Sequence, residues 1–433
     1  MNNLVWFRND LRIYDNQSLS KACAVKDHKV IGLYCFDPRH FDFGPFGFKK
    51  TEKFRAKFLL ESVFDLKKNL EKLNIPLFVY QQRPEDIIPS MTSQFKIDNI
   101  FLQKEWTSEE NEVLSAVTSK LSPTIPLEES YDQFLFHPED IPYDHFKNIP
   151  EVFTAFRKKC EKYAKISPCA PIPQPRSSED VLRNTTLLPS LKDLGFQEFT
   201  LDTRSAFPFE GGETQALKRI HNYFWETKNL AIYKKTRNGL VGEAYSSKLS
   251  AWLANGSISP RTIYWEIKRF EQEIKKNQDT YWLIFELIWR DYFKYVSLKH
   301  GNKIFKIEGI LNKHYQWGTD KELRKQWVSG STKYPFVNAN MHELAFTGWM
   351  SNRGRQNVAS FWSKEVCQDW RIGAAYFESI LIDYDVHSNW GNWMYNSGVG
   401  NDPRDRKFNI GRQAEMYDPS GKFQKLWLQE TLF

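Results

Sequence analysis

The sequence predicts an α/β domain with a parallel sheet at the N-terminal end, followed by a larger domain built only from helices. In the first part of the 433-residue chain, short apolar runs alternate with segments of helical periodicity, which is typical of a parallel sheet. A stretch rich in proline and polar residues, 165–210, then predicts a long connection. From Glu213 onward the apolar spacing is helical. We therefore expect an α/β domain at 1–130, a connector at 131–210 and a helical domain at 211–433.

Four apolar runs are predicted to form the sheet, namely Leu4–Phe7, Val30–Phe36, Leu77–Tyr80 and Ile100–Gln103. Between them, Lys53–Leu73 carries apolar residues at helical spacing, and Ser108–Leu121 opens with serine and acidic residues, as a helix does. No G-x-G-x-x-G loop occurs in this domain. The backbone therefore has no loop with which to approach a pyrophosphate, and we expect a Rossmann-like sheet that binds no dinucleotide in that way.

The second half is predicted to be helical over five segments, namely Ala216–Trp225, Ile263–Lys276, Tyr281–Val296, Asn338–Phe346 and Ala374–Leu381. Aromatic residues make up 15% of the chain, which includes 15 Trp. A buried Trp needs a partner for its N–H, so it is costly as simple filler. Some of these tryptophans are therefore expected to have a chemical role.

Charge and cysteine content narrow the class of protein. The net charge of +7 fits a polyanionic partner such as nucleic acid, and it fits a mildly basic soluble protein equally well. Five cysteines without a C-x-x-C pair indicate a reducing compartment, with neither a disulfide framework nor a metal site. No apolar run is long enough to span a membrane, and the N-terminus enters a strand at once. We expect a cytoplasmic monomer.

Two motifs of the helical half could carry chemistry. Tyr245–Ser250 places three hydroxyls and a Lys ahead of a helix, which suits either a phosphate cradle or an ordinary helix cap. Glu286, Trp289 and Arg290 share one face of a predicted helix. They form either an amphipathic helix with an internal ion pair or a pocket wall that stacks a base and bonds its edge.

Three further segments, Gly348–Phe361, Asp369–Arg371 and Leu381–Tyr395, closely resemble the flavin-site signature of the photolyase and cryptochrome family. Within that family the runs Ser-Asn-Arg-Gly-Arg-Gln-Asn-Val-Ala-Ser-Phe and Ser-Asn-Trp-Gly-Asn-Trp are most similar to the cryptochrome-DASH branch. The resemblance covers essentially the whole chain, from Trp6–Arg12 to Asp418–Trp427.

The resemblance implies a deoxyribodipyrimidine photolyase of the cryptochrome-DASH type. Its members hold FAD in a folded form in the helical domain, which agrees with the missing glycine loop. The implied reaction is blue-light-driven repair of cyclobutane pyrimidine dimers, with a preference for single-stranded DNA, by electron transfer from reduced flavin. The alternative is a blue-light photoreceptor that binds DNA or a transcriptional regulator with little or no repair activity.

The resemblance also implies which residues bind the flavin. A phosphate-contacting set and a set around the rings are expected, with Arg355 and Asp383 paired beside the flavin and Asn389 facing its N5. Arg is a permanent cation that suits an anionic reduced flavin. The full cofactor-binding set is Tyr233, Ser246, Ser247, Lys248, Leu249, Ser250, Arg290, Asn352, Arg355, Asp383, Asp385 and Asn389.

Two aromatic sets are implied for the reaction itself. Trp393, Trp370 and Trp317 match tryptophans that pass electrons from the surface to the flavin, although three core tryptophans would give the same spacing. Trp289 and Tyr395 fall where relatives sandwich the flipped dimer, with Glu286 donating to its carbonyls. Tyr395 replaces the Trp usual in duplex-specific photolyases. A smaller ring stacks less strongly, which matters less when the strand is already single.

The sequence departs from the family pattern in places. Lys333, Asn338 and His342 stand in a run that is otherwise similar, and the last two suggest one compensated loss of an ion pair. The loop with Glu105 and the acidic residues after Ser108 resembles the one that contacts a folate antenna, 5,10-methenyltetrahydrofolate. A helix cap explains that loop equally well.

Overall fold

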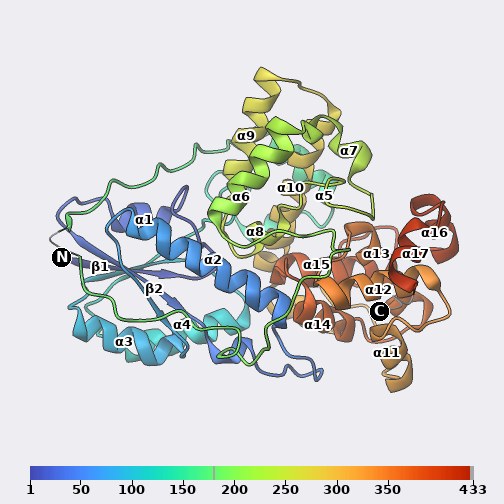
Figure 1. The fold of residues 1–433 in the computed structure, drawn as a ribbon, viewed down its shortest axis with the longest axis horizontal. Helices are drawn as coiled ribbons and strands as arrows, with labels where there is room; N and C mark the ends of the chain where they lie inside the picture. Colours follow the sequence, from blue (N-terminus) through green and yellow to red (C-terminus); the bar gives the residue numbers. More distant parts are fainter. Residues whose placement is uncertain (179–180, 430–433) are drawn as a thin grey trace.

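The N-terminal domain is a five-stranded parallel sheet in a computed structural model that describes residues 1–178 and 181–429 (Figure 1). The strand order is β3-β2-β1-β4-β5, and in the central pairings Leu4 lies opposite Ile31 on one side and Ile100 on the other. The strands are β1 (Asn2–Phe7), β2 (Lys29–Cys35), β3 (Leu77–Tyr80), β4 (Asn99–Gln103) and β5 (Leu127–Ser130). The predicted parallel sheet is confirmed. Its four predicted strands are present, and β5 is an addition.

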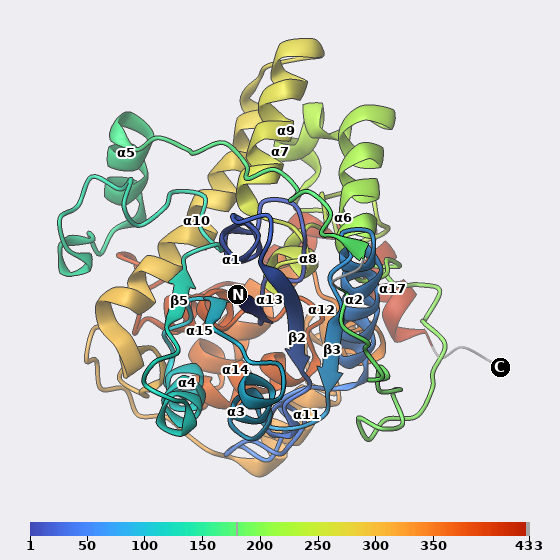
Figure 2. The same cartoon turned by 90° about the vertical axis from the view of Figure 1, so that its left-hand side faces the viewer.

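Helices cover both faces of this sheet, so its central strands are apolar on both sides. They are α1 (Gln17–Ala22), α2 (Lys53–Glu71), α3 (Pro84–Gln94) and α4 (Ser108–Lys120). Val5 and Phe7 of β1 pack in one core with α1 and α2, while Leu4 and Trp6 pack in a second core with α3 and α4. Figure 2 shows the sheet with these helices around it.

The connector contributes one helix, α5 (Phe153–Tyr163). Between Tyr163 and Glu213, the described residues form neither α-helix nor strand. This segment crosses the α/β domain before it enters the helical one (Figure 1), and Leu191, Leu194 and Phe196 join the core that α2 covers. The long connection predicted from the prolines is therefore packed along the first domain.

The C-terminal domain is helical throughout the described residues. Its helices are α6 (Glu213–Ile220), α7 (Tyr233–Thr236), α8 (Ser250–Ala254), α9 (Pro260–Glu273), α10 (Gln278–His300), α11 (Lys321–Val328), α12 (Pro335–Thr347), α13 (Asn352–Ser360), α14 (Trp370–Ile380), α15 (Val386–Ser397), α16 (Ile410–Tyr417) and α17 (Lys422–Leu428). The longest, α10, begins at a capping box between Asn277 and Thr280. The predicted all-helical domain is confirmed.

The predicted helix bounds differ from the observed ones, and three of these differences have a local cause. The segment predicted as one helix at 216–225 is α6 followed by a π-helical turn, His221–Glu226. The helix predicted to reach Lys276 ends at Glu273, because Asn277 already caps the next helix. The helix predicted from Ala374 starts at Trp370, where the side chain of Asp369 accepts the Arg371 N–H and caps it.

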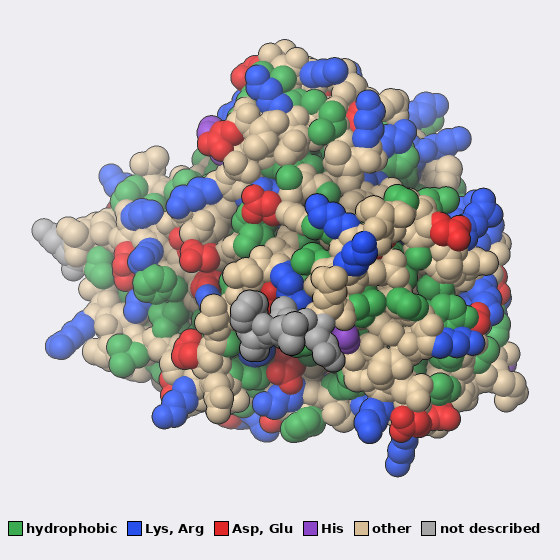
Figure 3. All heavy atoms as spheres, turned by 45° about the vertical axis from the view of Figure 1, so that its right-hand side comes forward, with side chains coloured by type: hydrophobic (Ala, Val, Ile, Leu, Met, Phe, Trp, Pro, Cys, Tyr) green, Lys and Arg blue, Asp and Glu red, His purple; other side chains and the backbone are tan. Residues whose placement is uncertain are grey.

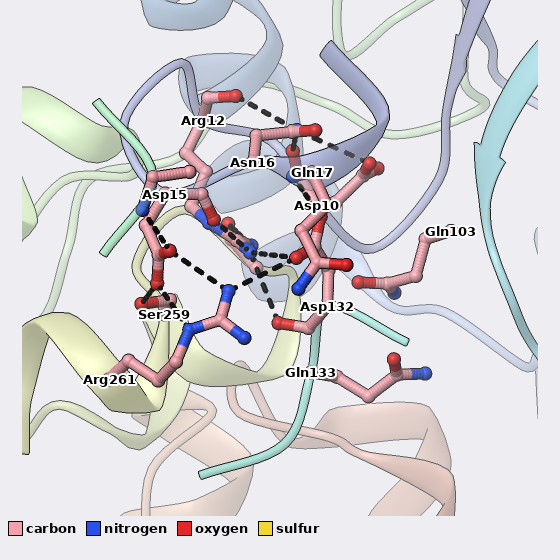
Figure 4. A network of polar contacts seen from close by, with 12 residues as sticks. Asp10, Arg12, Asp15, Asn16, Gln17, Gln103, Asp132, Gln133, Ser259 and Arg261 are labelled. Carbon is pink, nitrogen blue, oxygen red and sulfur yellow. Dashed lines mark hydrogen bonds and ion pairs between the residues drawn. The ribbon is translucent and has the colours of Figure 1, made fainter. Parts of the chain in front are cut away.

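A buried ion network joins the two domains (Figure 4). Arg261 of α9 donates to Asp15 at 2.9 Å and to Asp132 at 3.2 Å, and both carboxylates come from the N-terminal side of the chain. Arg12 donates to the carbonyl of Gly256 at 2.9 Å in the opposite direction. These charges are almost completely removed from water. Because each is paired, the network fixes how the domains face each other.

Candidate flavin and nucleic-acid site

Two close backbone approaches hold the helices that carry the candidate site. A β-carbon on Gly391 of α15 would lie 2.3 Å from the ring of Phe293 on α10, so α10 and α15 can touch only because this residue is glycine. A β-carbon on Gly373 of α14 would lie 2.2 Å from the ring of Trp393. The indole of Trp393 therefore packs directly against the backbone of α14, which a side chain at position 373 would prevent.

Arg355 and Asp383 form the ion pair that the sequence comparison implied. Arg355 Nη2 lies 2.9 Å from both carboxylate oxygens, and Asp383 is buried. Ser250 Oγ donates to Asp383 Oδ2 at 2.7 Å. The serine-rich segment and the ion pair, more than one hundred residues apart in sequence, thus belong to one site.

Lys248 is the unusual residue of that segment. Its side chain is 2% exposed, its Nζ has no hydrogen-bond partner among the described residues, and it lies 3.2 Å from the ring centre of Tyr245. Burial holds its pKa well below the usual range. The helix that follows, α8, has only five residues, so the positive charge here comes from Lys248. A buried amine with unused donors fits a phosphate ligand, whose negative charge would favour the protonated form of the amine.

Glu343 faces the same region with both carboxylate oxygens unpartnered among the described residues and an exposure of 1%. Burial raises its pKa to about 8, against the opposing influence of Lys248 and Arg355. Sequence reasoning did not single out Glu343, although it stands beside His342 in the family-like run. A buried acid, a buried base and their free polar atoms indicate a site built for a polar ligand.

The other predicted flavin residues lie at differing depths. Tyr233 begins α7 and is buried, and Asn352 is exposed at the first turn of α13. Ser246 is half-buried, Ser247 and Leu249 are buried, and Ser250 is exposed. Tyr233, Ser246, Ser247, Leu249 and Asn352 stay predictions as cofactor contacts.

Asn389 has a fixed amide. Its Nδ2 donates to the carbonyl of Ala374 at 3.0 Å, across the contact between α15 and α14. The amide oxygen is therefore the atom left to accept a hydrogen bond from a ligand.

Asp385 and Arg290 line a cavity whose lining does not include Asp383. Asp385 pairs with Lys294 at 2.9 Å and caps α15 through the Ser388 N–H. Burial alone would raise its pKa, but Lys294, His387 and Arg290 outweigh burial and hold the pKa of Asp385 well below its usual range. Arg290 donates to the carbonyls of Gln133 and Leu253.

This cavity, of about 530 Å³, lies between the two domains and is lined by Asp385, Arg290 and Glu105 together with aromatic rings such as Trp6 and Tyr384. Glu105 Oε1 accepts from Gln103 at 2.8 Å and from Asn9 at 3.3 Å. Glu105 is not the cap of α4, because the residue at the cap position is Thr107 and it makes no side-chain cap bond. The helix-cap explanation therefore does not account for Glu105.

Trp289 and Tyr395, more than one hundred residues apart in sequence, are in contact, and Glu286 lies one turn before Trp289 on α10. Phe153 of the connector stacks on Trp289 with ring centres 3.6 Å apart, and Tyr395 approaches Trp289 edge-on at 5.9 Å. Glu286 pairs with Arg237 at 2.7 Å rather than with Arg290, so the internal ion pair considered for α10 was wrong. Burial raises the pKa of Glu286, and Arg237 opposes that rise.

A second cavity, of about 310 Å³, opens beside Tyr395. Arg406 donates to the Tyr395 hydroxyl at 3.1 Å, and Arg353 lines the same cavity. Sequence reasoning missed Phe153, Arg237, Arg353 and Arg406. Two of them had a signal, because Arg353 stands in the family-like run Ser-Asn-Arg-Gly-Arg and Arg406 stands in the charged run Asp-Pro-Arg-Asp-Arg-Lys.

The three predicted electron-carrying tryptophans differ in burial. Trp370 and Trp393 are buried, and Trp317 is half-exposed, as a path from the surface to the interior requires. The ring centre of Trp370 lies 5.7 Å from that of Trp390, and the ring centre of Trp393 lies 6.1 Å from that of Trp327. Electron transfer along Trp393, Trp370 and Trp317 stays a prediction.

The residues that depart from the family pattern each have partners of their own. Asn338 accepts from both the backbone and the hydroxyl of Thr332 and donates back to its carbonyl. His342 places its two ring nitrogens 2.9 Å from the Trp427 carbonyl and 3.1 Å from the Ser329 carbonyl. The ammonium of Lys333 lies over the ring of Tyr334. Asn338 and His342 are therefore satisfied separately and hold the turn between α11 and α12.

Comparison with known proteins identifies the class. Residues 282–432 match the family model described as the FAD binding domain of DNA photolyase, and residues 3–176 match that of DNA photolyase. Cryptochrome DASH of Gloeobacter violaceus is 47% identical over 430 residues, covering 99% of this chain and 85% of that protein. Cryptochrome DASH of Danio rerio is 45% identical, covering 98% and 82%.

Solved structures agree with this. The Synechocystis cryptochrome superimposes with a TM-score of 0.94 at 46% identity, over 99% of this chain and 89% of that one. A class III photolyase of Agrobacterium tumefaciens gives 0.80 at 25% identity, over 99% and 86%. The fold and the matched domain define a flavoprotein of the photolyase type. The chain belongs to the photolyase and cryptochrome family, in its cryptochrome DASH branch. In the described residues no helix is long and apolar enough to cross a membrane.

Proposed function

We propose that this protein uses bound FAD and blue light to repair cyclobutane pyrimidine dimers in single-stranded or locally unpaired DNA. The observation that carries the proposal is the contact of Trp289 with Tyr395, which lines a cavity with Arg353 and Arg406, and the place of Glu286 one turn before Trp289 on α10. Two rings at 88° to each other offer separate faces to two bases of an extruded dimer. The arginines suit the flanking phosphates.

The residues of the helical domain fit FAD. Lys248 has free donors for the diphosphate, the Arg355–Asp383 pair provides a cation beside the rings, and Asn389 keeps an acceptor oxygen. When bound, the flavin supplies the light-excited electron for the dimer. The protein's part is to hold the cofactor away from water and to place the substrate against it.

Glu286 is proposed to bond the dimer carbonyls. Because burial raises its pKa, more of it is protonated than an exposed Glu at the same pH, and a protonated carboxyl can donate to a carbonyl oxygen. Arg237 remains beside it to balance the ionised form.

The preference for single strands is proposed from Tyr395. Stacking of a base on an aromatic ring contributes about 1–3 kcal/mol, and extrusion from a duplex costs a few kcal/mol. A tyrosine at this position leaves less stacking to offset the cost of extrusion. Lys and Arg side chains are spread over one face of the molecule, interspersed with acidic ones, which suits weak capture of a strand (Figure 3).

The cavity between the domains is proposed to hold a 5,10-methenyltetrahydrofolate antenna. Its aromatic lining suits a planar ring, and the Glu105 carboxylate suits the N–H groups of a pterin. Titration with this folate, followed by its near-ultraviolet absorbance, should show binding that Glu105→Gln weakens. Binding of equal strength in the variant would remove Glu105 from the proposal.

The test of repair is to illuminate the reduced, FAD-loaded protein with dimer-containing single-stranded and duplex oligonucleotides and to follow loss of the dimer. Faster loss in single strands is expected, and Trp289→Phe should slow it. Trp265→Phe is the matched control, because Trp265 lies on α9 with 40% of its surface exposed and donates a hydrogen bond to the Ser167 carbonyl, away from Trp289. No loss in either substrate would overturn repair and favour the photoreceptor. Equal rates of dimer loss in duplex and single-stranded DNA would contradict the single-strand preference proposed from Tyr395.

A further inference from the structure

Tyr315 lies against the outermost of the three predicted electron-carrying tryptophans. The ring centres of Tyr315 and Trp317 are 5.3 Å apart, at an angle of 55°. The Tyr315 hydroxyl donates to Asp405 Oδ2 at 2.8 Å. A phenol therefore touches Trp317 on one side and a proton acceptor on the other.

Lys364 completes this cluster. Its ammonium lies 4.7 Å from the centre of the Tyr315 ring and pairs with the other oxygen of Asp405. A β-carbon on Gly398 would lie 2.0 Å from Asp405 Oδ1 and 2.4 Å from Lys364 Nζ. The end of α15 thus leaves room for the pair only because Gly398 has no side chain. Three segments distant in sequence converge on one tyrosine.

We propose that Tyr315 is the terminal electron donor of the light-driven chain, and that it loses its proton to Asp405 as it is oxidised. The proposal rests on the proposed role of Trp317. Light-driven oxidation of the tryptophan chain by the bound flavin leaves Trp317 as an indole radical cation. One electron passes from Tyr315 to Trp317, the Tyr315 O–H bond breaks, and the proton joins the Asp405 carboxylate. The products are neutral Trp317, a neutral Tyr315 radical and the Asp405 carboxylic acid.

The charges around Tyr315 favour this coupled step over loss of the electron alone. The Lys364 ammonium beside the ring penalises a positive charge on it. Loss of the proton removes that charge. Burial, the hydrogen bond to Asp405 and the charge of Asp405 raise the pKa of Tyr315 to about 12, so the phenol keeps its proton until it is oxidised.

The proton then has a way out. The Asp405 side chain is 40% exposed, so it can pass the proton to water. The electron on the flavin side could then return only by reducing the distant Tyr315 radical, and the phenol would be restored only when a proton also comes back. Tyr315 would therefore lengthen the life of the reduced flavin.

Transient absorption of the FAD-loaded, oxidised protein after a blue flash tests this. In the wild type, the tryptophan radical signal should decay while that of a neutral tyrosyl radical rises. In Tyr315→Phe no tyrosyl signal should appear, and the tryptophan radical should persist until it recombines. In Asp405→Asn the transfer should slow about tenfold, which corresponds to a barrier higher by ~1.4 kcal/mol. Transfer in the wild type should also slow in heavy water.

Tyr281→Phe is the matched control. Tyr281 also donates to a carboxylate, that of Glu161, but its neighbouring ring is Phe285. This variant should keep the wild-type signals. Identical tryptophan-radical decay in the wild type and Tyr315→Phe would overturn the proposal.

Trp317→Phe separates this proposal from the one on which it rests. If the wild type forms a tryptophan radical and Trp317→Phe changes nothing, the proposed electron path is wrong. If Trp317→Phe abolishes the radical while Tyr315→Phe has no effect, the path holds and Tyr315 is not its donor.

Discussion

Two buried clusters of ionisable side chains in this molecule are equally removed from water, but they differ in how many of their polar atoms have hydrogen-bond partners. Between the domains, Arg261 bonds Asp15 and Asp132, and the backbone supplies further partners (Figure 4). In the helical domain, Lys248 and Glu343 are as deeply buried, yet the Lys248 ammonium and both Glu343 carboxylate oxygens have no hydrogen-bond partner among the described residues. The first cluster is complete without a ligand, and the second is complete only with one.

The largest effect is expected from breaking the complete cluster. Arg261→Met leaves Asp15 and Asp132 buried without their shared partner, which should lower the free energy of unfolding by about 3–5 kcal/mol. Urea unfolding followed by circular dichroism measures this. Arg269→Met on the same helix removes exposed pairs with Glu266 and Glu273 and a contact with the Trp225 ring, and it should cost less than about 1 kcal/mol. Equal costs for the two variants would contradict the contrast.

A substitution in the cluster of Lys248 and Glu343 should change the affinity for FAD more than the free energy of unfolding. Lys248→Met removes hydrogen bonds to a charged phosphate, each of which contributes about 1.5–3 kcal/mol, so FAD affinity should fall roughly ten- to one-hundredfold. The apoprotein should be no less stable, because a buried polar group without a hydrogen-bond partner is gone. Flavin fluorescence titration measures the affinity. Lys268→Met, which removes a partner of Glu271, is the control and should bind FAD normally.

The pH dependence of the apoprotein's unfolding free energy should further distinguish the cluster of Lys248 and Glu343 from the network around Arg261. Glu343 has a folded-state pKa raised by burial to about 8, so the folded state holds its proton more tightly than the unfolded chain. Its contribution to stability is present at low pH and is lost as the pH rises through about 8. Glu343→Gln should show a flatter loss of unfolding free energy with rising pH. Parallel curves for the two proteins would mean that Glu343 is already ionised in the fold.

The smallest effect is expected at an accessory contact between the domains. Asn255 donates to Ser62 Oγ of α2 at 2.8 Å and accepts the Ser257 N–H. This contact gives the Asn255 side chain a structural role between α8 and α2. Asn255→Leu should lower the free energy of unfolding by about 0.5–1.5 kcal/mol, measured in urea. A cost near that of Arg261→Met would mean that Asn255 belongs to the main network.

Features with local periodicity could be predicted from the sequence. The central strands and α10 follow from apolar spacing, and the pairing of Arg355 with Asp383 followed from motif resemblance. The edge strand β5 was missed because Leu-Glu-Glu-Ser is short and charged, as exposed edges tend to be. Phe153 against Trp289 and Arg237 against Glu286 were also missed. Each joins segments distant in sequence, and neither partner stands in a pattern that identifies the other.

The stacking of Phe153 on Trp289 makes the first part of the connector a structural component of the helical domain. Phe153 belongs to α5, which packs on α10 well before the helical domain begins at Glu213 (Figures 1 and 2). Asp291 of α10 is likewise bonded by the backbone N–H groups of Leu135 and Phe136. A helical domain expressed from Glu213 onward would lose one wall of its aromatic pocket and two bonds that anchor its longest helix. Recombination that exchanged the α/β half would have to carry residues 131–163 with the helices.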